Sequence, residues 1–141
     1  MSKNKELIAE DITLSIPFYD IDMMGVCWHG HYVKYFEEAR CKLLDKVGYD
    51  YQAMLDSGFY WPVIDMRLKY IKPLKFGQKI KVRAAIEEYE MRLLIRYSIV
   101  DAETNDKITK GYTSQVAVKM DNLEMMFESP EILREKIQAC L

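Results

Sequence analysis

Apolar residues fall on every second position in several segments of the chain, which is the pattern of strands with one buried face. The first such segment runs from Ile12 to Phe18, where Pro17 disfavours a central, fully hydrogen-bonded position. After Gly58 the same period returns in further segments, whose alternating positions are Ile64, Met66, Leu68 and Tyr70, then Ile80, Val82, Ala84 and Ile86, then Leu93, Ile95, Tyr97 and Ile99, then Tyr112, Ser114, Val116, Val118 and Met120. The pattern predicts an antiparallel sheet of about five strands.

Between Tyr32 and Val47 the apolar period changes to that of a helix. The residues on one helical face are Tyr32, Tyr35, Phe36, Ala39, Leu43 and Val47. Gly48 follows where a C-terminal cap belongs, so the pattern predicts one helix of about four turns. The apolar face is wide, because Val33 and Leu44 extend it, and a curved sheet would cover such a face better than a single neighbouring helix.

The order of these elements is a strand, a long helix and then several strands in succession, which is an α+β layout in which one sheet buries one helix. A short terminal helix is predicted to open at Ser129 and Pro130, with the serine as N-cap and the proline in the first helical position. An open sheet leaves edges exposed, and small domains commonly protect an edge by pairing with a second copy. The sequence therefore predicts a single domain over residues 1–141 that forms at least a dimer.

Composition narrows the possible functions. The chain has 141 residues, of which 50% are hydrophobic, and its 20 basic and 22 acidic side chains give a net charge of −2, so no global basic field attracts nucleic acid or an anionic membrane. No apolar run approaches the ~18 residues of a membrane span, and no signal-peptide pattern opens the chain. The chain has three cysteines, Cys27, Cys41 and Cys140. Their odd number and wide spacing do not match a disulfide framework or a zinc site. We expect a cytoplasmic protein without a metal or other cofactor.

Groups capable of chemistry concentrate between Phe18 and Tyr32. This segment carries both histidines of the chain, two carboxylates and a glycine, directly ahead of the predicted long helix. Acids and a histidine on a loop that feeds a helix N-terminus combine proton-transfer groups with free backbone N–H donors. Such a set suits a reaction that builds negative charge on oxygen.

A spaced motif covers this segment and the start of the predicted helix. It reads Tyr19-Asp20-x-Asp22-x-x-Gly25-x-x-x-His29-x-x-Tyr32-x-x-Tyr35-Phe36-Glu37-x-Ala39-Arg40. Together with the layout, it resembles the hotdog-fold acyl-CoA thioesterases of the hydroxybenzoyl-CoA thioesterase branch. The segment from Tyr70 to Ile80 is also similar to that family's connection between its second and third strands, and the likeness runs from about Ile12 to Met120.

The resemblance implies a hotdog fold, in which the sheet wraps the long helix. It further implies homodimers joined edge to edge, or tetramers made of two such dimers, with the active site at the dimer interface and an acyl-CoA as substrate. Asp22 matches the carboxylate that acts as base or nucleophile on the thioester. The backbone N–H of His29 matches the donor that polarises the thioester carbonyl, and its side chain matches a histidine found here in many members.

Tyr19, Gly25, Trp28 and Arg92 are the candidates for substrate binding. Because coenzyme A carries phosphates, basic side chains near turns or strand ends are candidates to meet them, and these are Lys72, Lys75, Arg92 and Lys110. The same side chains have a plainer role in keeping the outer face of strands soluble and unpaired. One position departs from the family pattern: Phe18 stands where some members have a tyrosine, so a water-orienting phenol is missing unless Tyr19 supplies it.

The loop residues have plainer interpretations beside the catalytic ones. Asp22 can be a turn residue that bonds its own backbone, and Asp20 can be a structural hydrogen-bond acceptor or a charge that raises its neighbour's pKa. His29 can cap or pack the helix start, and His31 is an ordinary first-turn residue. His29 and His31 with the two aspartates do not form a complete metal-ligand set of recognised spacing.

Two further candidates are weighed against structural roles. Glu37 is the reserve catalytic carboxylate, since another branch of the fold uses a helix glutamate, but an i,i+3 pair would let it compensate Arg40 at the margin of the apolar face. Cys27 is flanked by the apolar Val26 and Trp28, which indicates burial more than a nucleophilic thiol.

The favoured function is hydrolysis of an acyl-CoA, in which Asp22 or a water molecule attacks the thioester carbon. A thiol with a pKa near ~8.5 is a good leaving group, which fits a site with one carboxylate and no full triad. Two other functions fit the same fold: an acyl-CoA-binding module without turnover, and an enoyl hydratase or dehydratase. The spacing of Asp22 and His29 and the single short domain favour the thioesterase.

Overall fold

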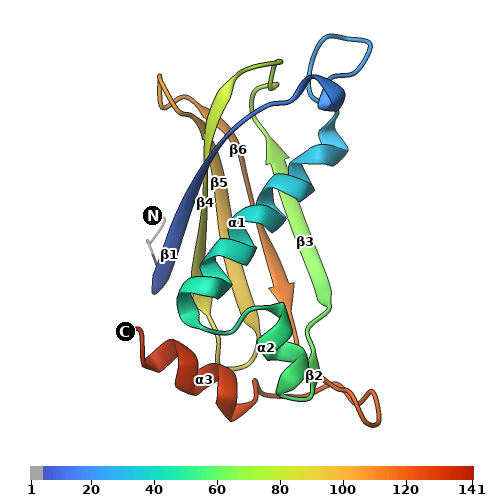
Figure 1. Cartoon of the computed structure of the whole chain (residues 1–141), viewed down its shortest axis with the longest axis vertical. Coiled ribbons are helices and arrows are strands. Elements are labelled where there is room, and N and C mark those ends of the chain that lie inside the picture. Colours follow the sequence, from blue (N-terminus) through green and yellow to red (C-terminus); the bar gives the residue numbers. More distant parts are fainter. Residues whose placement is uncertain (1–4) are drawn as a thin grey trace.

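The computed structural model describes residues 5–141 as one antiparallel sheet that curves around a long helix (Figure 1). The sheet has five strands in the order β1-β4-β5-β6-β3. The bounds of the main elements are β1 Ile8–Ser15, α1 Tyr32–Val47, β3 Val63–Tyr70, β4 Lys79–Glu88, β5 Leu93–Asp101 and β6 Lys107–Gln115. This arrangement confirms the predicted α+β class and hotdog architecture. No helix within the described range has the length and apolar character of a membrane span.

Shorter elements connect and flank this framework. They are two 3-10 turns, η1 Phe18–Asp20 and η2 His29–His31, the helices α2 Tyr51–Asp56 and α3 Glu131–Gln138, and a small second sheet of β2 Phe59–Tyr60 and β7 Val118–Lys119. Helix α2, which is only six residues long, was not predicted from the sequence. Its N-cap is Asp50, whose carboxylate accepts the Ala53 N–H at 2.8 Å.

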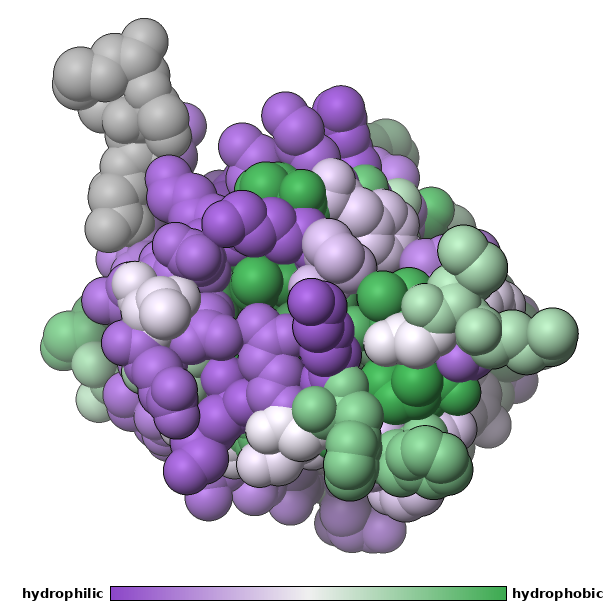
Figure 2. Space-filling view, turned by 90° about the horizontal axis from the view of Figure 1, so that it is seen from above, coloured by the Kyte–Doolittle hydropathy of each residue, from purple (hydrophilic) through white to green (hydrophobic). Residues whose placement is uncertain are grey.

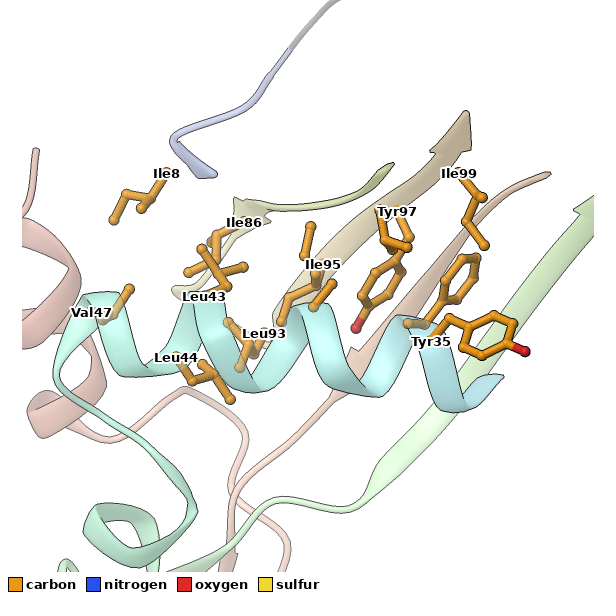
Figure 3. Close-up of a cluster of buried hydrophobic side chains, with 14 of the residues drawn as sticks. Ile8, Tyr35, Leu43, Leu44, Val47, Ile86, Leu93, Ile95, Tyr97 and Ile99 are labelled. Carbon is orange, nitrogen blue, oxygen red and sulfur yellow. The ribbon is translucent and has the colours of Figure 1, made fainter. Parts of the chain in front are cut away.

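Helix α1 begins and ends where its apolar period predicts. Gly48 closes it in the left-handed region at φ 82°, which glycine adopts without a Cβ penalty, and its N–H reaches the carbonyls of Leu44 and Asp45. The apolar face packs on β1 and β4, and Figure 3 shows side chains from α1 and from the strands meeting in one core. Fully buried members include Leu43 and Ile95, each at 0% exposure, and such burial contributes about 1.5–3 kcal/mol per side chain.

A glycine in β6 lets the long helix approach the sheet closely. The Phe36 ring of α1 stacks on the Tyr97 ring of β5 with centroids 4.4 Å apart and planes 6° apart. A Cβ on Gly111 would lie 3.0 Å from the Phe36 ring and 2.1 Å from the Arg67 carbonyl oxygen. Only glycine therefore fits this part of the helix-to-sheet interface.

Three predicted boundaries are wrong, for identifiable reasons. The first strand ends at Ser15 and not at Phe18, because Pro17, which has no N–H, becomes the N-cap of η1. It begins at Ile8 and not at Ile12, since its pairing with β4 starts at Ile86. The predicted strand through residues 112–120 is two strands, since β6 ends at Gln115 and β7 pairs with β2. Helix α3 has Pro130 as its N-cap without a side-chain bond, so Ser129 is not the cap.

Strand β3 forms an edge of the sheet and is open to solvent on both faces. Alternation places Met66 and Tyr70 on the face toward α1, yet these side chains are 43% and 46% exposed because α1 packs mainly on β1 and β4. Val63 and Ile64 at the start of the strand are 41% and 51% exposed. The sequence pattern of an amphipathic strand is therefore present, but this chain alone does not bury its apolar row.

Candidate active site

The segment between β1 and α1 forms a hairpin loop at one end of the sheet (Figure 1). Ile21 and Cys27 make an antiparallel bridge, and the Trp28 N–H donates to the Asp20 carbonyl at 3.1 Å. Gly25 closes the turn at φ +78°, a conformation that favours glycine, and its N–H reaches the Asp22 carbonyl at 3.0 Å. The loop thereby holds Asp22 in its tip and leads back to the start of α1.

The Asp22 carboxylate has one occupied and one open oxygen. Its Oδ1 accepts the Met24 N–H at 2.8 Å, which is the local bond expected of a turn aspartate. Its Oδ2 has no hydrogen-bond partner among residues 5–141. The side chain is half-buried, so a substrate or a water molecule can reach this oxygen. The turn role and the catalytic role are therefore compatible.

His29 lies where the loop enters the helix. It opens η2, which continues directly into α1, and within residues 5–141 its backbone N–H donates to no acceptor. Its carbonyl accepts the hydroxyl of Tyr70 from the end of β3 at 2.9 Å and also the Tyr32 N–H. A helix start combines unpaired N–H donors with the positive end of the helix dipole. This position can stabilise negative charge on a substrate oxygen.

The Trp28 ring covers the same turn. Its centroid lies 5.0 Å from the ring of His29 and 5.4 Å from the ring of His31. A Cβ on Gly30 would lie 2.1 Å from the Trp28 ring, so the glycine is required for this packing. Half of the tryptophan, 49%, remains exposed and forms an apolar wall beside the helix start.

A buried charge cluster anchors the loop to α1. Asp20 is 2% exposed, and its carboxylate accepts the Tyr35 hydroxyl at 2.5 Å and the Lys34 ammonium at 2.9 Å. Nδ1 of His31 lies 3.7 Å from the same carboxylate. Burial acts to raise the pKa of Asp20, but the hydrogen bonds from Tyr35 and Lys34 outweigh it and hold the pKa below its usual range. The structural interpretation of Asp20 is therefore confirmed.

Leu74 connects the loop and the helix from the β3–β4 side. Its carbonyl accepts the Cys27 N–H at 2.7 Å, and its N–H donates to the Tyr32 hydroxyl at 3.2 Å.

Burial raises the pKa of Tyr32 to about 12, although the hydrogen bond from the Leu74 N–H acts against this. Burial likewise raises the pKa of the Cys27 thiol, which is 4% exposed. Cys27 is thus buried, as its apolar neighbours predict, and its thiol is protonated at neutral pH.

Large apolar side chains surround the loop on the surface. Seen from above, this end of the molecule carries a patch of apolar residues on one side (Figure 2). Besides Trp28, the exposed apolar side chains of the loop and its neighbour include Phe18, Met23, Met24 and Phe76. The rings of Phe18 and Phe76 meet edge to face at 5.6 Å. Tyr19 is 81% exposed, with the Lys34 ammonium 5.9 Å from its ring centroid. The surroundings suit an apolar ligand.

The two remaining candidates lie apart from the loop. Arg92 stands just before β5, at the opposite end of the sheet, and its Nε pairs with Glu88 at 3.0 Å. Glu37 pairs with Arg40 at 3.4 Å, which confirms the predicted i,i+3 pair. Arg40 is buried and also donates to the hydroxyl of Tyr51 at 3.0 Å. Within one chain, the structure does not bring Arg92 to Asp22.

Sequence reasoning missed three side chains that shape this site. They are Lys34 and Tyr35, which hold Asp20, and Tyr70, which holds the His29 carbonyl. The apolar helix face pointed to burial of Tyr35, but the partner of its hydroxyl depends on how the loop folds back. Nor does any group of three or more His, Cys, Asp and Glu side chains among residues 5–141 form a metal-binding cluster.

Comparison with known proteins identifies the family of this chain. The thioesterase-like superfamily matches residues 16–137. The chain belongs to this family. Its membership and its fold confirm the predicted enzyme class, a thioester hydrolase of the hotdog type.

Individual relatives in this family carry different names. The solved DHNA-CoA thioesterase of Staphylococcus aureus is 29% identical with a TM-score of 0.80, and the match covers 94% of this chain and 92% of that one. The chloroplastic acyl-acyl carrier protein thioesterase ATL3 of Arabidopsis thaliana is 24% identical over 89% of this chain and 66% of its own length. The 1,4-dihydroxy-2-naphthoyl-CoA hydrolase of Thermosynechococcus vestitus is 22% identical over 78% of this chain and 76% of its own length.

Proposed function

We propose that this protein hydrolyses acyl-CoA thioesters, with Asp22 as the base or nucleophile and the backbone N–H of His29 as the oxyanion donor. The observation that carries this proposal is the pairing of two open groups on one loop. A carboxylate oxygen of Asp22 and the N–H of His29 both lack a partner among residues 5–141. A hydrolytic site for a carbonyl needs such a pair, one group to deliver the attack and one to hold the developing charge.

The chemistry follows from these two groups. Asp22 either attacks the thioester carbon, giving an anhydride that water then opens, or removes a proton from the attacking water. In both routes the carbonyl oxygen becomes an oxyanion that accepts the His29 N–H, after which the C–S bond breaks and coenzyme A leaves as a thiolate. Because a thiol has a pKa near ~8.5, the leaving group needs little proton donation. The products are the free acid and coenzyme A.

A second copy of the chain completes the site in this proposal. The open edge β3 has exposed apolar side chains, and an exposed apolar edge favours pairing with an identical strand. A two-fold pairing of β3 with itself would place the Tyr70 end of one strand beside the Val63 end of the other. Val63 and Leu93 both lie opposite Gln115, so this pairing would also bring Arg92 of the partner copy to the Asp22 end. The assignment of Arg92 to substrate binding depends on it.

The test is release of free thiol from a panel of acyl-CoAs by the wild type and by Asp22→Asn. The variant should fold normally, bind substrate and lose kcat by orders of magnitude, since it loses a group used in the transition state. Glu37→Gln is the matched control, because Glu37 is a carboxylate of α1 that pairs with Arg40 away from the loop, and this variant should keep its kcat. Near-normal kcat in folded Asp22→Asn, together with loss in Glu37→Gln, would transfer the role to Glu37.

The same panel separates the other functions that fit the fold. A binding module would retain acyl-CoA without releasing thiol, which isothermal titration with a nonhydrolysable acyl-CoA thioether would detect. An enoyl hydratase would change the absorbance of an enoyl-CoA without releasing coenzyme A. Either outcome would replace the proposed hydrolysis.

A further inference from the structure

The face of the sheet that points away from α1 carries a basic hollow. Along β5, burial alternates so that Tyr97 is buried on the side of α1 while Arg96 is exposed on the outer side. The outer face holds a hollow of about 540 Å³, lined by Lys5, Arg67, Lys69, Glu87, Arg96, Lys110, Gly111 and Tyr112. Five of the side chains around it are cationic and one is acidic. We call this set of residues the outer hollow.

The charges of the outer hollow are poorly compensated within the chain. Lys69 of β3 lies directly opposite Lys110 of β6, and like charges in a cross-strand pair are destabilising. Neither lysine, nor Arg67, has a carboxylate partner among residues 5–141, whereas Arg96 pairs with Glu87 at 2.7 Å. The whole chain has a net charge of −2, so this cluster does not follow from a basic composition. An anionic ligand would offset the repulsion.

An aromatic ring lies in the middle of the outer hollow. Tyr112 is directly opposite Arg67 on one side and Arg96 on the other, and the Arg96 guanidinium lies 5.7 Å from its ring centroid. The Tyr112 hydroxyl donates to Asp65 at 3.1 Å, which fixes the ring at the edge of the sheet. Planar guanidinium groups and an aromatic ring offer stacking surfaces for a purine, and the cations around them suit phosphates.

We propose that the outer hollow binds the nucleotide end of coenzyme A, the adenosine with its 3′-phosphate and diphosphate. This inference rests on the proposed function and specifies coenzyme A, and not a protein-bound acyl group, as the carrier of the substrate. Lys69 and Lys110 meet the phosphates, and Tyr112 with its arginine neighbours meets the adenine. This ligand is chosen because the outer hollow places several cations without carboxylate partners around one aromatic ring, and a nucleotide offers phosphates to the cations and a flat base to the ring.

The distance between the outer hollow and Asp22's loop fits the length of the substrate. Tyr70, whose hydroxyl holds the His29 carbonyl, is the next residue along β3 after Lys69. Arg67 lies three residues from Tyr70, which is about 10 Å along a strand. The pantetheine arm between thioester and diphosphate is as long as roughly four residues of extended chain, about 14 Å. Because Lys69 and Tyr70 alternate to opposite faces of the sheet, the arm passes around the Tyr70 end of β3 in this proposal, and its length lets one molecule span both places.

The test uses Lys69→Glu in the full-length protein, with Lys81→Glu as the matched control. Lys81 is exposed on the same outer face, in β4, outside the outer hollow. Glutamate at position 69 would face Lys110 as an ion pair, so this variant should melt at the wild-type temperature or above it. Loss of function in Lys69→Glu thus cannot be ascribed to unfolding, and the measured melting curve verifies this.

Kinetics with two substrates that share the acyl group isolate the nucleotide. For acyl-CoA, Lys69→Glu should raise KM roughly tenfold with kcat kept, the scale of losing charge-assisted contacts to phosphate, and added salt should narrow the difference. For acyl-pantetheine, which lacks the nucleotide, wild type and variant should share one KM. Adenosine 3′,5′-bisphosphate should bind the wild type and Lys81→Glu in isothermal titration, and bind Lys69→Glu roughly tenfold more weakly.

Several results would overturn this inference. Equal KM changes for acyl-CoA and acyl-pantetheine, or none for either, would remove the nucleotide from the outer hollow. Selective loss of activity on an acyl carrier protein would make the hollow a docking surface for that acidic protein instead. If the wild type hydrolyses no thioester, the proposed function fails, while binding of adenosine 3′,5′-bisphosphate still decides separately whether the hollow is a nucleotide site.

Discussion

Replacing the buried carboxylate of Asp20 by an amide tests how the active loop is held. In the wild type, the Asp20 carboxylate accepts hydrogen bonds from the Tyr35 hydroxyl at 2.5 Å and from the Lys34 ammonium at 2.9 Å. Asp20→Asn keeps the shape of the side chain but removes its negative charge. The wild-type carboxylate is 2% exposed, and its pKa lies below the usual range despite burial, because the bonds from Tyr35 and Lys34 stabilise the ionised form. Removal of the charge therefore costs folding free energy.

The magnitude follows from the kind of contact that is lost. A hydrogen bond to a charged group is worth about 1.5–3 kcal/mol, and breaking a fully buried ion pair costs about 3–5 kcal/mol. The Lys34 side chain is 46% exposed, so water screens part of its attraction to Asp20. The range for a hydrogen bond to a charged group therefore applies, and not the range for a fully buried ion pair. We expect Asp20→Asn to lose about 2–3 kcal/mol at neutral pH, which lowers the melting temperature by roughly 5–10 °C in a chain of this size.

The pH dependence has a defined sign. A carboxylate whose pKa is lowered by folding stabilises the native state above its unfolded pKa of about 3.9, and this contribution is lost as the pH falls toward the folded value. The stability difference between wild type and Asp20→Asn should thus be constant from about pH 7 to 5.5 and shrink below about pH 4. The measurement is urea unfolding followed by circular dichroism at a series of pH values.

Two further substitutions, one of them also combined with Asp20→Asn, make the measurement decisive. Tyr35→Phe removes only the hydroxyl, and the double variant with Asp20→Asn should lose less than the sum of the single losses, because both act on one contact. Asp121→Asn is the control, since Asp121 is exposed and its loss should be within about 0.5 kcal/mol. A loss in Asp20→Asn as small as that of the control, or one that persists undiminished at about pH 3, would refute a stabilising buried charge.

Further predictions concern the oxyanion donor, the sheet and the open edge. His29→Ala keeps the backbone N–H, and one oxyanion donor is worth ~10²–10³ in kcat, so the kcat of this variant should fall far less than that of Asp22→Asn. An equal fall in the two variants would assign the main role to the imidazole. Gly111→Ala should lower the melting temperature by several degrees or prevent folding, because its Cβ would lie 2.1 Å from the Arg67 carbonyl oxygen, and an unchanged melting curve would contradict this close approach. Met66→Lys, in the middle of β3, should yield a monomer by light scattering and lower the activity; an active dimer would show that β3 is not the interface.

The elements that can be predicted from the sequence are those that repeat a strong local pattern. The period of the long helix predicted both of its ends, because its apolar face is continuous and Gly48 supplies the left-handed cap. The alternating segments predicted the number and antiparallel type of the main strands. The ends of β1 and β6 were predicted less well, since apolar alternation continues past the residues where hydrogen bonding to a neighbour stops.

The candidate loop was found from the sequence, because its acids, histidines and glycine stand together in the chain. The turn at Gly25 and the entry into α1 at His29 are local features, and residue types and spacing are enough to place them. The same spacing carried the family resemblance, which the match to the thioesterase-like superfamily confirms. The catalytic roles of Asp22 and His29 stay predictions until the kinetics are measured.

Contacts between residues far apart in the chain could not be predicted from the sequence. The bond from Tyr70 to His29 spans 41 residues, and Lys69 faces Lys110 because of the register between β3 and β6. Such contacts depend on strand order and on how the helix crosses the sheet, and local composition does not encode either. The same holds for the exposure of β3: its alternation predicts a buried face, but α1 is too narrow to cover five strands and leaves that edge open.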